Sequence, residues 1–152
     1  MMNVLVTVGT TSFDTLVKAC DLIAEDKDNI NFLFQIGNGT YIPKNGKYLC
    51  FTNNIESLYD QADLVICHAG AGTIYRLLEL AKKVILVPNL ERIDKHQSDI
   101  SIYMERRGYL SVAWSINDLK NVFERQESFN PVSFKKDSFF KYDEIANFIT
   151  GH

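Results

Sequence analysis

Short apolar runs alternate with segments of helical periodicity along most of this chain. The first run, Asn3 to Val8, is rich in β-branched residues, and apolar residues then recur at helical spacing from Phe13 to Ala24. The same alternation predicts strands over residues 3–8, 31–36, 47–52, 63–67, 84–87 and 110–113, and helices over residues 13–25, 55–61, 73–81, 95–107, 116–125 and 142–149. Strands that are apolar nearly throughout need cover on both faces. We therefore expect an α/β fold: one doubly wound domain over residues 1–152, with a six-stranded, mostly parallel sheet.

Several helix ends carry recognisable capping residues. Ser12 is placed to cap the first helix, and Asp94 to cap the helix that follows the fifth strand. Gly108 stands where the left-handed residue after that helix is expected. Asp94 and Gln97 also have the spacing of a capping box, which gives this segment a purely structural interpretation.

Composition excludes several classes of protein. The chain has 152 residues, 46% of them apolar and 23% charged, with a net charge of -3 and no basic run, so a nucleic-acid partner is not expected. The three cysteines have no metal-ligand spacing and an odd count, as in a reducing compartment. With no signal peptide and no transmembrane run expected, the sequence predicts a cytoplasmic protein that reaches a membrane only through a partner.

Polar and glycine-rich segments follow the predicted strands. In doubly wound folds, ligands bind beyond the carboxyl ends of the strands. We therefore expect one binding rim, built from residues 9–12, 37–39, 53–54, 68–73 and 89–97.

The segment His68-Ala69-Gly70-Ala71-Gly72-Thr73 leads from a buried strand into a helix. Glycines let a ligand approach the backbone, and the N–H groups of a helix N-terminus attract anions. A plain tight turn is the alternative at this stage, and the turn alone does not decide between the two. Tyr75 stands where the dinucleotide fingerprint requires a small residue, which argues against NAD.

The remaining rim residues have two interpretations each. His68 is either a histidine bonded at the edge of the core or a donor to a phosphate or sugar hydroxyl. His96 and Gln97 either belong to a helix cap or face a sugar. Gly9 and Thr10 are either a plain turn before a helix or part of the site, and Gly37 and Asn38 are either a turn or a place of close approach to a ligand.

Together these segments resemble the C-terminal, donor-binding, Rossmann-like domain of the GT-B glycosyltransferases of family 28. The resemblance covers residues 3–113 and rests on Val-Gly-Thr-Thr at 8–11, Gln-Ile-Gly-Asn-Gly at 35–39, Ala-Asp-Leu-Val-Ile at 62–66, His-Ala-Gly-Ala-Gly-Thr at 68–73 and His-Gln at 96–97. It is nearest to small catalytic subunits of two-chain transferases, in dolichol-linked glycan synthesis and in bacterial exopolysaccharide and capsule synthesis.

The resemblance implies inverting transfer from a UDP-sugar, with no cofactor and no metal. Backbone amides from Gly70 through Ala71 and Gly72 to Thr73 would hold the diphosphate, and Asn54 and Ile55 would lie against uracil. His96 and Gln97 would face the sugar, and Gly9 and Thr10 would border the cleft with the acceptor. Gly37, Asn38, His68 and Arg76 complete the donor-binding set. His68 and His96 are the candidate catalytic residues.

One position departs from the pattern of many relatives. They carry Glu on the helix after the glycine turn, where it binds the ribose, and this chain has Arg76. Arg76 either points outward or adds charge near the phosphates.

The resemblance also implies an acceptor half on another chain. We expect a membrane-associated acceptor-binding subunit that brings a lipid-linked acceptor. Residues 138–152 are the expected docking tail, with the aromatic residues near Phe129 and Phe134 beside it; completion of the domain's own core is the alternative. The alternative function is a non-catalytic nucleotide-sugar-binding or scaffold module. The donor sugar stays open among glucose, galactose, GlcNAc and glucuronate.

Overall fold

The computed structural model of the chain describes residues 1–68, 70–89 and 95–134, with only the backbone described for residue 71 and residues 95–97. Within these ranges, six strands form one sheet in the order β3-β2-β1-β4-β5-β6. Every pairing in it is parallel, which confirms the predicted doubly wound sheet. The strands are β1 (Met2–Thr7), β2 (Ile30–Gln35), β3 (Lys47–Leu49), β4 (Leu64–Cys67), β5 (Lys83–Leu86) and β6 (Ser111–Val112).

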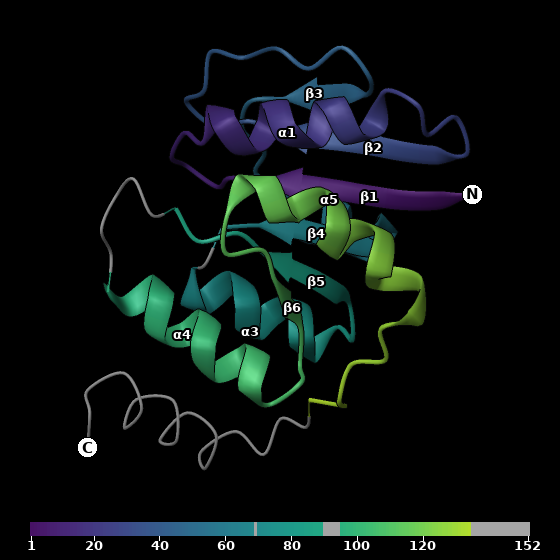
Figure 1. Cartoon of the computed structure of the whole chain (residues 1–152). Coiled ribbons are helices and arrows are strands. Elements are labelled where there is room, and N and C mark those ends of the chain that lie inside the picture. The colour runs from purple at the N-terminus through teal and green to yellow at the C-terminus, as the bar shows by residue number, and fades with distance from the viewer. Residues whose placement is uncertain (69, 90–94, 135–152) are drawn as a thin grey trace.

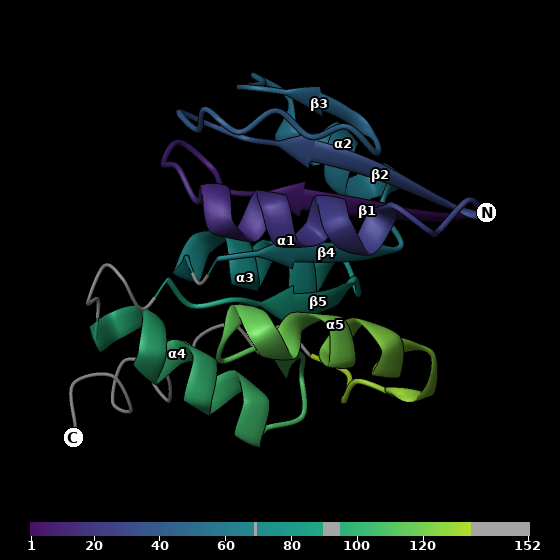
Figure 2. The same cartoon turned by 45° about the horizontal axis from the view of Figure 1, so that its top comes forward.

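Helices cover both faces of this sheet (Figures 1 and 2). They are α1 (Asp14–Ala24), α2 (Ile55–Gln61), α3 (Ala71–Glu79), α4 (Lys95–Arg106) and α5 (Ile116–Glu124), with a short 3₁₀ helix, η1 (Arg125–Ser128). Residues of α1 and α5 pack into one core cluster. Residues of α2, α3 and α4 pack into a second cluster on the opposite face.

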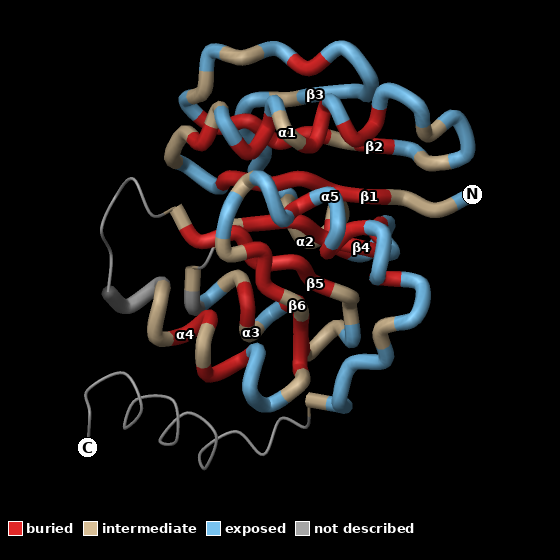
Figure 3. Tube along the Cα trace, in the orientation of Figure 1, coloured by how far each residue is buried: buried red, intermediate tan, exposed pale blue. Residues whose placement is uncertain are grey.

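The strand sequences explain the two cores. Successive side chains of a strand point to opposite faces, so in β1 Val4 and Val6 enter the first cluster and Leu5 enters the second. The central strands are buried along most of their length (Figure 3). β1 lies at the middle of the sheet, where its Val4 pairs with Phe32 of β2 on one side and Leu64 of β4 on the other. The carboxyl ends of β1, β2 and β4 therefore lie side by side at one edge of the sheet.

Some predicted boundaries were wrong, for local reasons. Ser12 does not cap α1: Phe13 holds the cap position without a side-chain hydrogen bond, and its carbonyl accepts the N–H groups of Leu16 and Val17. β3 ends at Leu49 and not at residue 52, because the next carbonyl, of Cys50, accepts hydrogen bonds from Gly37 N–H and the Gln35 side chain. α3 begins at Ala71, two residues early, since Gly70 takes the cap position.

Other predicted features agree with the structure or lie outside it. Gly108 has the expected left-handed backbone, with φ +74°. Asp94 and residues 138–152, including the helix expected over 142–149, lie outside the described residues. No helix within the described residues is long and apolar enough to cross a membrane.

Phe134 lies against the second core cluster. Its ring is 6.0 Å from that of Tyr75 and 5.3 Å from that of Tyr109, measured between centroids. The segment before it is tied to the domain by a hydrogen bond from Val132 N–H to Gly108 C=O. For Phe134, the alternative of completing the domain's own core is therefore the correct one.

Candidate functional site

The carboxyl ends of β1, β2 and β4 and the segment after β3 surround a cavity of about 250 Å³. Five residues predicted for the site line it together: Gly9, Thr10, Ile55, His68 and Thr73. The remaining lining residues were not predicted: Thr7, Gln35, Phe51, Thr52, Tyr59 and Cys67. The cavity lies where doubly wound folds bind their ligands.

The glycine turn contributes the N-terminus of α3 to this rim. The Gly70 N–H donates to the His68 carbonyl, and the Gly70 carbonyl accepts the first helical hydrogen bond, from Ile74. The N–H groups of Ala71, Gly72 and Thr73 lie in the first helical turn, where no carbonyl of the same helix can accept them. These groups and the helix dipole favour an anion.

The turn does not need glycine for its own shape. Gly70 has φ −102° and ψ 128°, an extended backbone that any residue adopts. Within the part of the chain that the structure describes, a Cβ atom added at Gly70 or Gly72 would have no neighbouring atom within 4 Å. Glycine at both places leaves open space beside the helix N-terminus, as a ligand close to the backbone requires. The backbone angles of Gly70 do not require glycine, and the plain tight turn that the sequence left open stays the alternative to a ligand site.

His68 lies at the edge of the cavity, directly after β4. Burial lowers the pKa of its imidazole, so the ring is neutral near neutral pH and offers one donor and one acceptor nitrogen. A Cβ atom on Gly9 would stand 3.6 Å from the His68 ring. The residues that follow β1 and β4 therefore lie next to each other in the cavity wall.

Tyr59 of α2 adds a hydroxyl to the same wall. Burial raises its pKa, against a smaller lowering by its hydrogen bond with the Thr73 side chain. The Tyr59 hydroxyl therefore remains protonated, and it connects α2 to the first turn of α3.

Gly37 and Asn38 support the rim from behind rather than lining the cavity. A Cβ atom on Gly37, which has φ +59°, would overlap the carbonyl oxygen of Thr11. The Asn38 N–H donates to that carbonyl at 3.0 Å, and the Asn38 side chain donates to the Thr10 carbonyl at 3.0 Å. The close approach expected at Gly37 is thus made by the chain's own backbone.

The residues expected near uracil lie at the start of α2. Asn54 caps this helix, its side-chain oxygen accepting the Ser57 N–H at 3.3 Å. Ile55, next in the chain, lines the cavity. Beside it, Phe51 is 54% exposed although it is a large apolar side chain, so the cavity has an uncovered aromatic surface.

Arg76 points towards α2 and does not line the cavity. Its guanidinium forms ion pairs with Glu56 of α2 and, at 3.4 Å, with Glu79 of its own helix. Of the two orientations that the sequence allowed, the structure shows the one away from the phosphate position.

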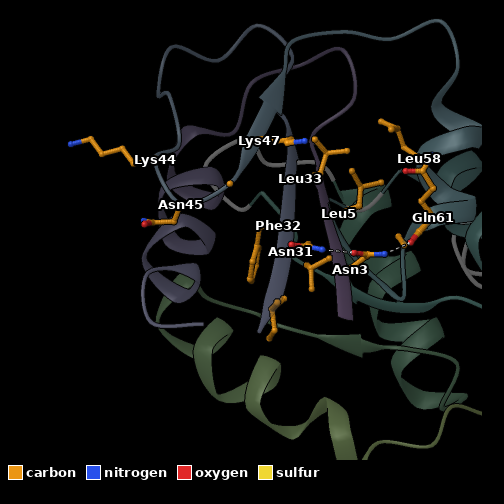
Figure 4. A pocket seen from close by; sticks show the side chains of 14 residues that line it. Asn3, Leu5, Asn31, Phe32, Leu33, Lys44, Asn45, Lys47, Leu58 and Gln61 are labelled. Carbon is orange, nitrogen blue, oxygen red and sulfur yellow. Dashed lines mark hydrogen bonds between the residues drawn. The ribbon is translucent and has the colours of Figure 1, made fainter. Parts of the chain in front are cut away.

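A larger cavity, of about 580 Å³, opens near the amino ends of β1, β2 and β3 (Figure 4). Its amides bond to one another: Asn31 donates to the Asn3 side chain, and Asn3 donates to the Gln61 carbonyl, each at 3.2 Å. Lys44 extends away from the other labelled side chains (Figure 4). This cavity is at the wrong end of the strands for the predicted site, and volume alone does not make it the better candidate.

The site roles predicted for Ala71, His96 and Gln97 stay untested, because their side chains lie outside the described residues. No three His, Cys, Asp or Glu side chains are grouped to hold a metal ion within residues 1–68, 70–89 and 95–134, and metal-independent binding remains a prediction.

The parallel sheet, the glycine turn at a helix N-terminus and the cavity beside it define a doubly wound α/β domain with a candidate ligand site at the carboxyl ends of its strands. Residues 3–138 match the glycosyltransferase family 28 C-terminal domain. The chain belongs to this family, as its motifs indicated.

Relatives of known name support the assignment. The chain is 36% identical over 122 residues to the mouse UDP-N-acetylglucosamine transferase subunit ALG13, covering 72% of this chain and 10% of that protein. It is 36% identical over 99 residues, or 64% of this chain and 26% of the relative, to the UDP-N-acetylglucosamine--N-acetylmuramyl-(pentapeptide) pyrophosphoryl-undecaprenol N-acetylglucosamine transferase of Prochlorococcus marinus. The chain thus spans a tenth to a quarter of these two relatives.

The NMR structure of ALG13 has a similar fold. It superimposes with a TM-score of 0.66 at 20% identity, over 98% of this chain and 97% of the other. This likeness confirms the predicted fold class.

Proposed function

We propose that this chain is the sugar-donor-binding subunit of an inverting glycosyltransferase, which uses a UDP-sugar to extend a lipid-diphosphate-linked saccharide. The open space at Gly70 and Gly72, beside the N-terminus of α3, is the observation that carries the proposal. The family match and the names of the relatives support it.

In this proposal the diphosphate lies on the N–H groups of Ala71, Gly72 and Thr73. The uracil lies near Ile55 and Phe51, where apolar atoms line the cavity. The sugar extends towards His68 and the start of α4, which carries His96 and Gln97. No metal and no cofactor takes part.

The proposed reaction is a direct displacement. The acceptor hydroxyl oxygen forms a bond to the anomeric carbon as the bond from that carbon to the β-phosphate oxygen breaks, and UDP leaves with the electron pair. The hydroxyl proton passes to a base, for which His68 and His96 are the candidates in this chain. Because negative charge grows on the leaving diphosphate, the amides at the start of α3 stabilise the transition state more than the ground state.

The sugar and the acceptor follow from the relatives. Both are named as N-acetylglucosamine transferases, so we propose UDP-N-acetylglucosamine as the donor. The bacterial relative is named for an undecaprenyl pyrophosphoryl acceptor, which favours a lipid-linked acceptor here. Exopolysaccharide synthesis, expected from the sequence, has no counterpart in either name and stays a prediction.

The mouse relative is named as a subunit. We propose that this chain likewise acts with a membrane-associated, acceptor-binding subunit at the cytoplasmic face of a membrane. The tail, residues 138–152, is the proposed docking segment. Removal of the tail is expected to abolish association and leave a folded domain, whereas an unfolded product would assign the tail to the core.

A second candidate is a non-catalytic nucleotide-sugar-binding module. Arg76 favours it, because this residue stands where many relatives carry the ribose-binding Glu, and its guanidinium forms an ion pair with Glu56. Both candidate functions require binding of the nucleotide sugar, and only the first includes transfer of the sugar to an acceptor.

Substitution at the cap of α3 tests the binding step. Aspartate and asparagine are both good helix caps and have nearly the same shape, so Gly70→Asp and Gly70→Asn are expected to stay folded. Only Gly70→Asp sets a negative charge against the diphosphate. We expect calorimetric titration with UDP to show weaker binding by Gly70→Asn and still weaker binding, by at least tenfold, by Gly70→Asp.

No binding of UDP by the unchanged protein would overturn the proposal, and so would equal affinities for the two variants. Transfer is then assayed after co-expression with the acceptor-binding subunit, using a lipid-linked acceptor. Binding without transfer would favour the non-catalytic module.

A further inference from the structure

Gln35, the last residue of β2, is a buried polar side chain that follows the apolar run Phe32-Leu33-Phe34, and only 3% of it is exposed. It lines the cavity described above, but it lies behind the residues that border the open rim. Neither the glycine turn nor the proposed transfer chemistry accounts for an amide at this place.

The Gln35 side chain makes four hydrogen bonds. Its oxygen accepts the Thr7 hydroxyl at 2.5 Å and the Gly9 N–H at 2.9 Å. Its nitrogen donates to the Gly9 carbonyl at 2.8 Å and to the Cys50 carbonyl at 2.6 Å. The two acceptor and two donor positions of the amide are thereby all used.

This pattern fixes the amide in one orientation. Rotation by a half turn would set its nitrogen against the Gly9 N–H and its oxygen against two carbonyls. Because Gln35 bonds both the N–H and the C=O of Gly9, it pairs with that residue as a neighbouring strand would. Gly9 has φ +67°, so its backbone turns out of the strand at this place.

The bonded partners belong to two separate walls of the cavity. Gly9 leads into Thr10, and Cys50 leads into Phe51 and Thr52, all of which line the cavity except Cys50. The two walls are 41 residues apart between Gly9 and Cys50, and the same amide contacts both. Neither wall belongs to a helix or strand at this point, so their separation depends on local contacts.

We propose that Gln35 is a positioning residue of the sugar-donor site, one whose amide holds the Gly9–Thr10 turn and the Cys50–Thr52 segment at the separation that the nucleotide needs. The residue does not touch the reacting atoms. This inference rests on the proposed function, since the ligand whose fit it controls is the UDP moiety.

Gln35→Met tests the proposal, because methionine has a similar length and makes none of the four hydrogen bonds. The matched control is Gln126→Met. Gln126 is also a buried glutamine, 5% exposed, and its nitrogen donates to Ser111 Oγ and the Val122 carbonyl. Its backbone carbonyl accepts from Lys83, at the amino end of β5, so it lies at the opposite end of the sheet from the cavity.

Both variants are expected to melt at a lower temperature than the unchanged protein. UDP titrations are run at a temperature at which circular dichroism shows each protein folded. We expect Gln35→Met to bind UDP at least tenfold more weakly, and Gln126→Met to bind it as the unchanged protein does. Equal affinity of Gln35→Met and the unchanged protein would overturn the inference.

A milder variant keeps the test decisive if Gln35→Met does not fold. Thr7→Val removes one of the four hydrogen bonds and preserves the shape of the side chain. Gln35→Glu keeps both bonds to the oxygen and sets a carboxylate against the Gly9 and Cys50 carbonyls. The expected order of UDP affinity is unchanged protein, then Thr7→Val, then Gln35→Glu; affinity equal to that of the unchanged protein in both variants would refute the role.

The outcomes separate this inference from the proposed function. If the unchanged protein does not bind UDP, the proposed function fails. If it binds UDP and the Gln35 variants bind equally well, only the positioning role fails. The Gln35 variants are then assayed in the complete transferase. If Gln35 positions the sugar-donor site, they raise the KM for the UDP-sugar and leave the KM for the acceptor unchanged. If its role is purely structural, they lower only the amount of active enzyme.

Discussion

Replacement of Gly72 by alanine is expected to move stability and ligand binding in opposite directions. Gly72 is the second residue of α3, and a Cβ atom there would meet no atom of the described residues within 4 Å. Glycine loses more backbone entropy than alanine when a helix forms. Where the backbone suits both residues, this exchange stabilises a protein by about 0.4–1 kcal/mol.

For a chain of this size, such a gain raises the melting temperature by about 1–4 °C. The methyl group, however, occupies the space in which the diphosphate is proposed to approach the backbone. Loss of one hydrogen bond to a charged group costs about 1.5–3 kcal/mol, which corresponds to a fall in affinity of roughly tenfold to 150-fold.

Thermal unfolding followed by circular dichroism gives the first quantity, and calorimetric titration with UDP gives the second. Gly46→Ala is the control, because its Cβ atom would stand 2.5 Å from the Phe32 carbonyl oxygen, near the amino end of β3. It is expected to lower the melting temperature and to leave the UDP affinity of the folded protein unchanged. A Gly72→Ala protein that binds UDP normally, or that melts lower than the unchanged protein, would refute the reasoning.

Three further predictions concern charged groups. Burial lowers the pKa of His68, so an NMR titration should give a value below its ordinary 6.5, and UDP should raise that value because an anion favours the imidazolium; no change at saturating UDP would place the diphosphate elsewhere. At Asp21, burial opposes ionisation, but hydrogen bonds from Tyr41 and from backbone N–H groups outweigh it and lower the pKa. The stabilisation by Asp21 is therefore complete above its ordinary pKa, about 3.9, and is lost as pH falls through the lower folded value. Asp21→Ala should cost about 1–3 kcal/mol at pH 7 in urea unfolding, with a smaller loss at pH 3, since it removes the charged acceptor of the Lys44 and Asn45 N–H groups; an equal cost at both pH values would contradict this account. Arg76→Ala removes exposed ion pairs, so the free energy of unfolding should change by less than about 1 kcal/mol. The affinity for UDP should change by less than about threefold, because Arg76 does not line the cavity. A large loss of affinity would show that Arg76 contacts the nucleotide.

The sheet and most helices could be predicted because each depends on a local pattern. The bounds predicted for α2, residues 55–61, are those observed, since the polar cap at Asn54 precedes a short periodic segment. The end of β3 was predicted three residues late: the Cys50 carbonyl bonds to the Gly37 N–H, beyond the end of β2, and to the Gln35 side chain. No pattern within residues 47–52 shows that contact.

The same distinction applies to the site. The glycine turn and His68 could be recognised from their places after β4. Gln35 belongs to the motif Gln-Ile-Gly-Asn-Gly, but its role depends on contacts with Gly9 and Cys50. Those two residues come within reach of Gln35 only once the strands have paired. Gly37 had two interpretations, a turn and a place of close approach to a ligand; the structure shows a turn, and the group close to Gly37 is the Thr11 carbonyl, 26 residues earlier in the chain. For Gln35, the one signal in the sequence was a glutamine directly after the apolar run Phe32-Leu33-Phe34.

Four separate parts of the chain line the cavity, and they come together only when β1 pairs with β2 and β4. They are Thr7, Gly9 and Thr10; Gln35; Phe51, Thr52, Ile55 and Tyr59; and Cys67, His68 and Thr73. An unfolded chain scatters these segments, so a nucleotide that bridges them selects the folded form and acts as a reversible cross-link between distant parts of the sequence. By mass action, UDP at 100 times its dissociation constant would add about 2.7 kcal/mol to the free energy of unfolding. In a cell, if the proposed function holds, the supply of sugar nucleotide then helps to determine how much of this protein stays folded.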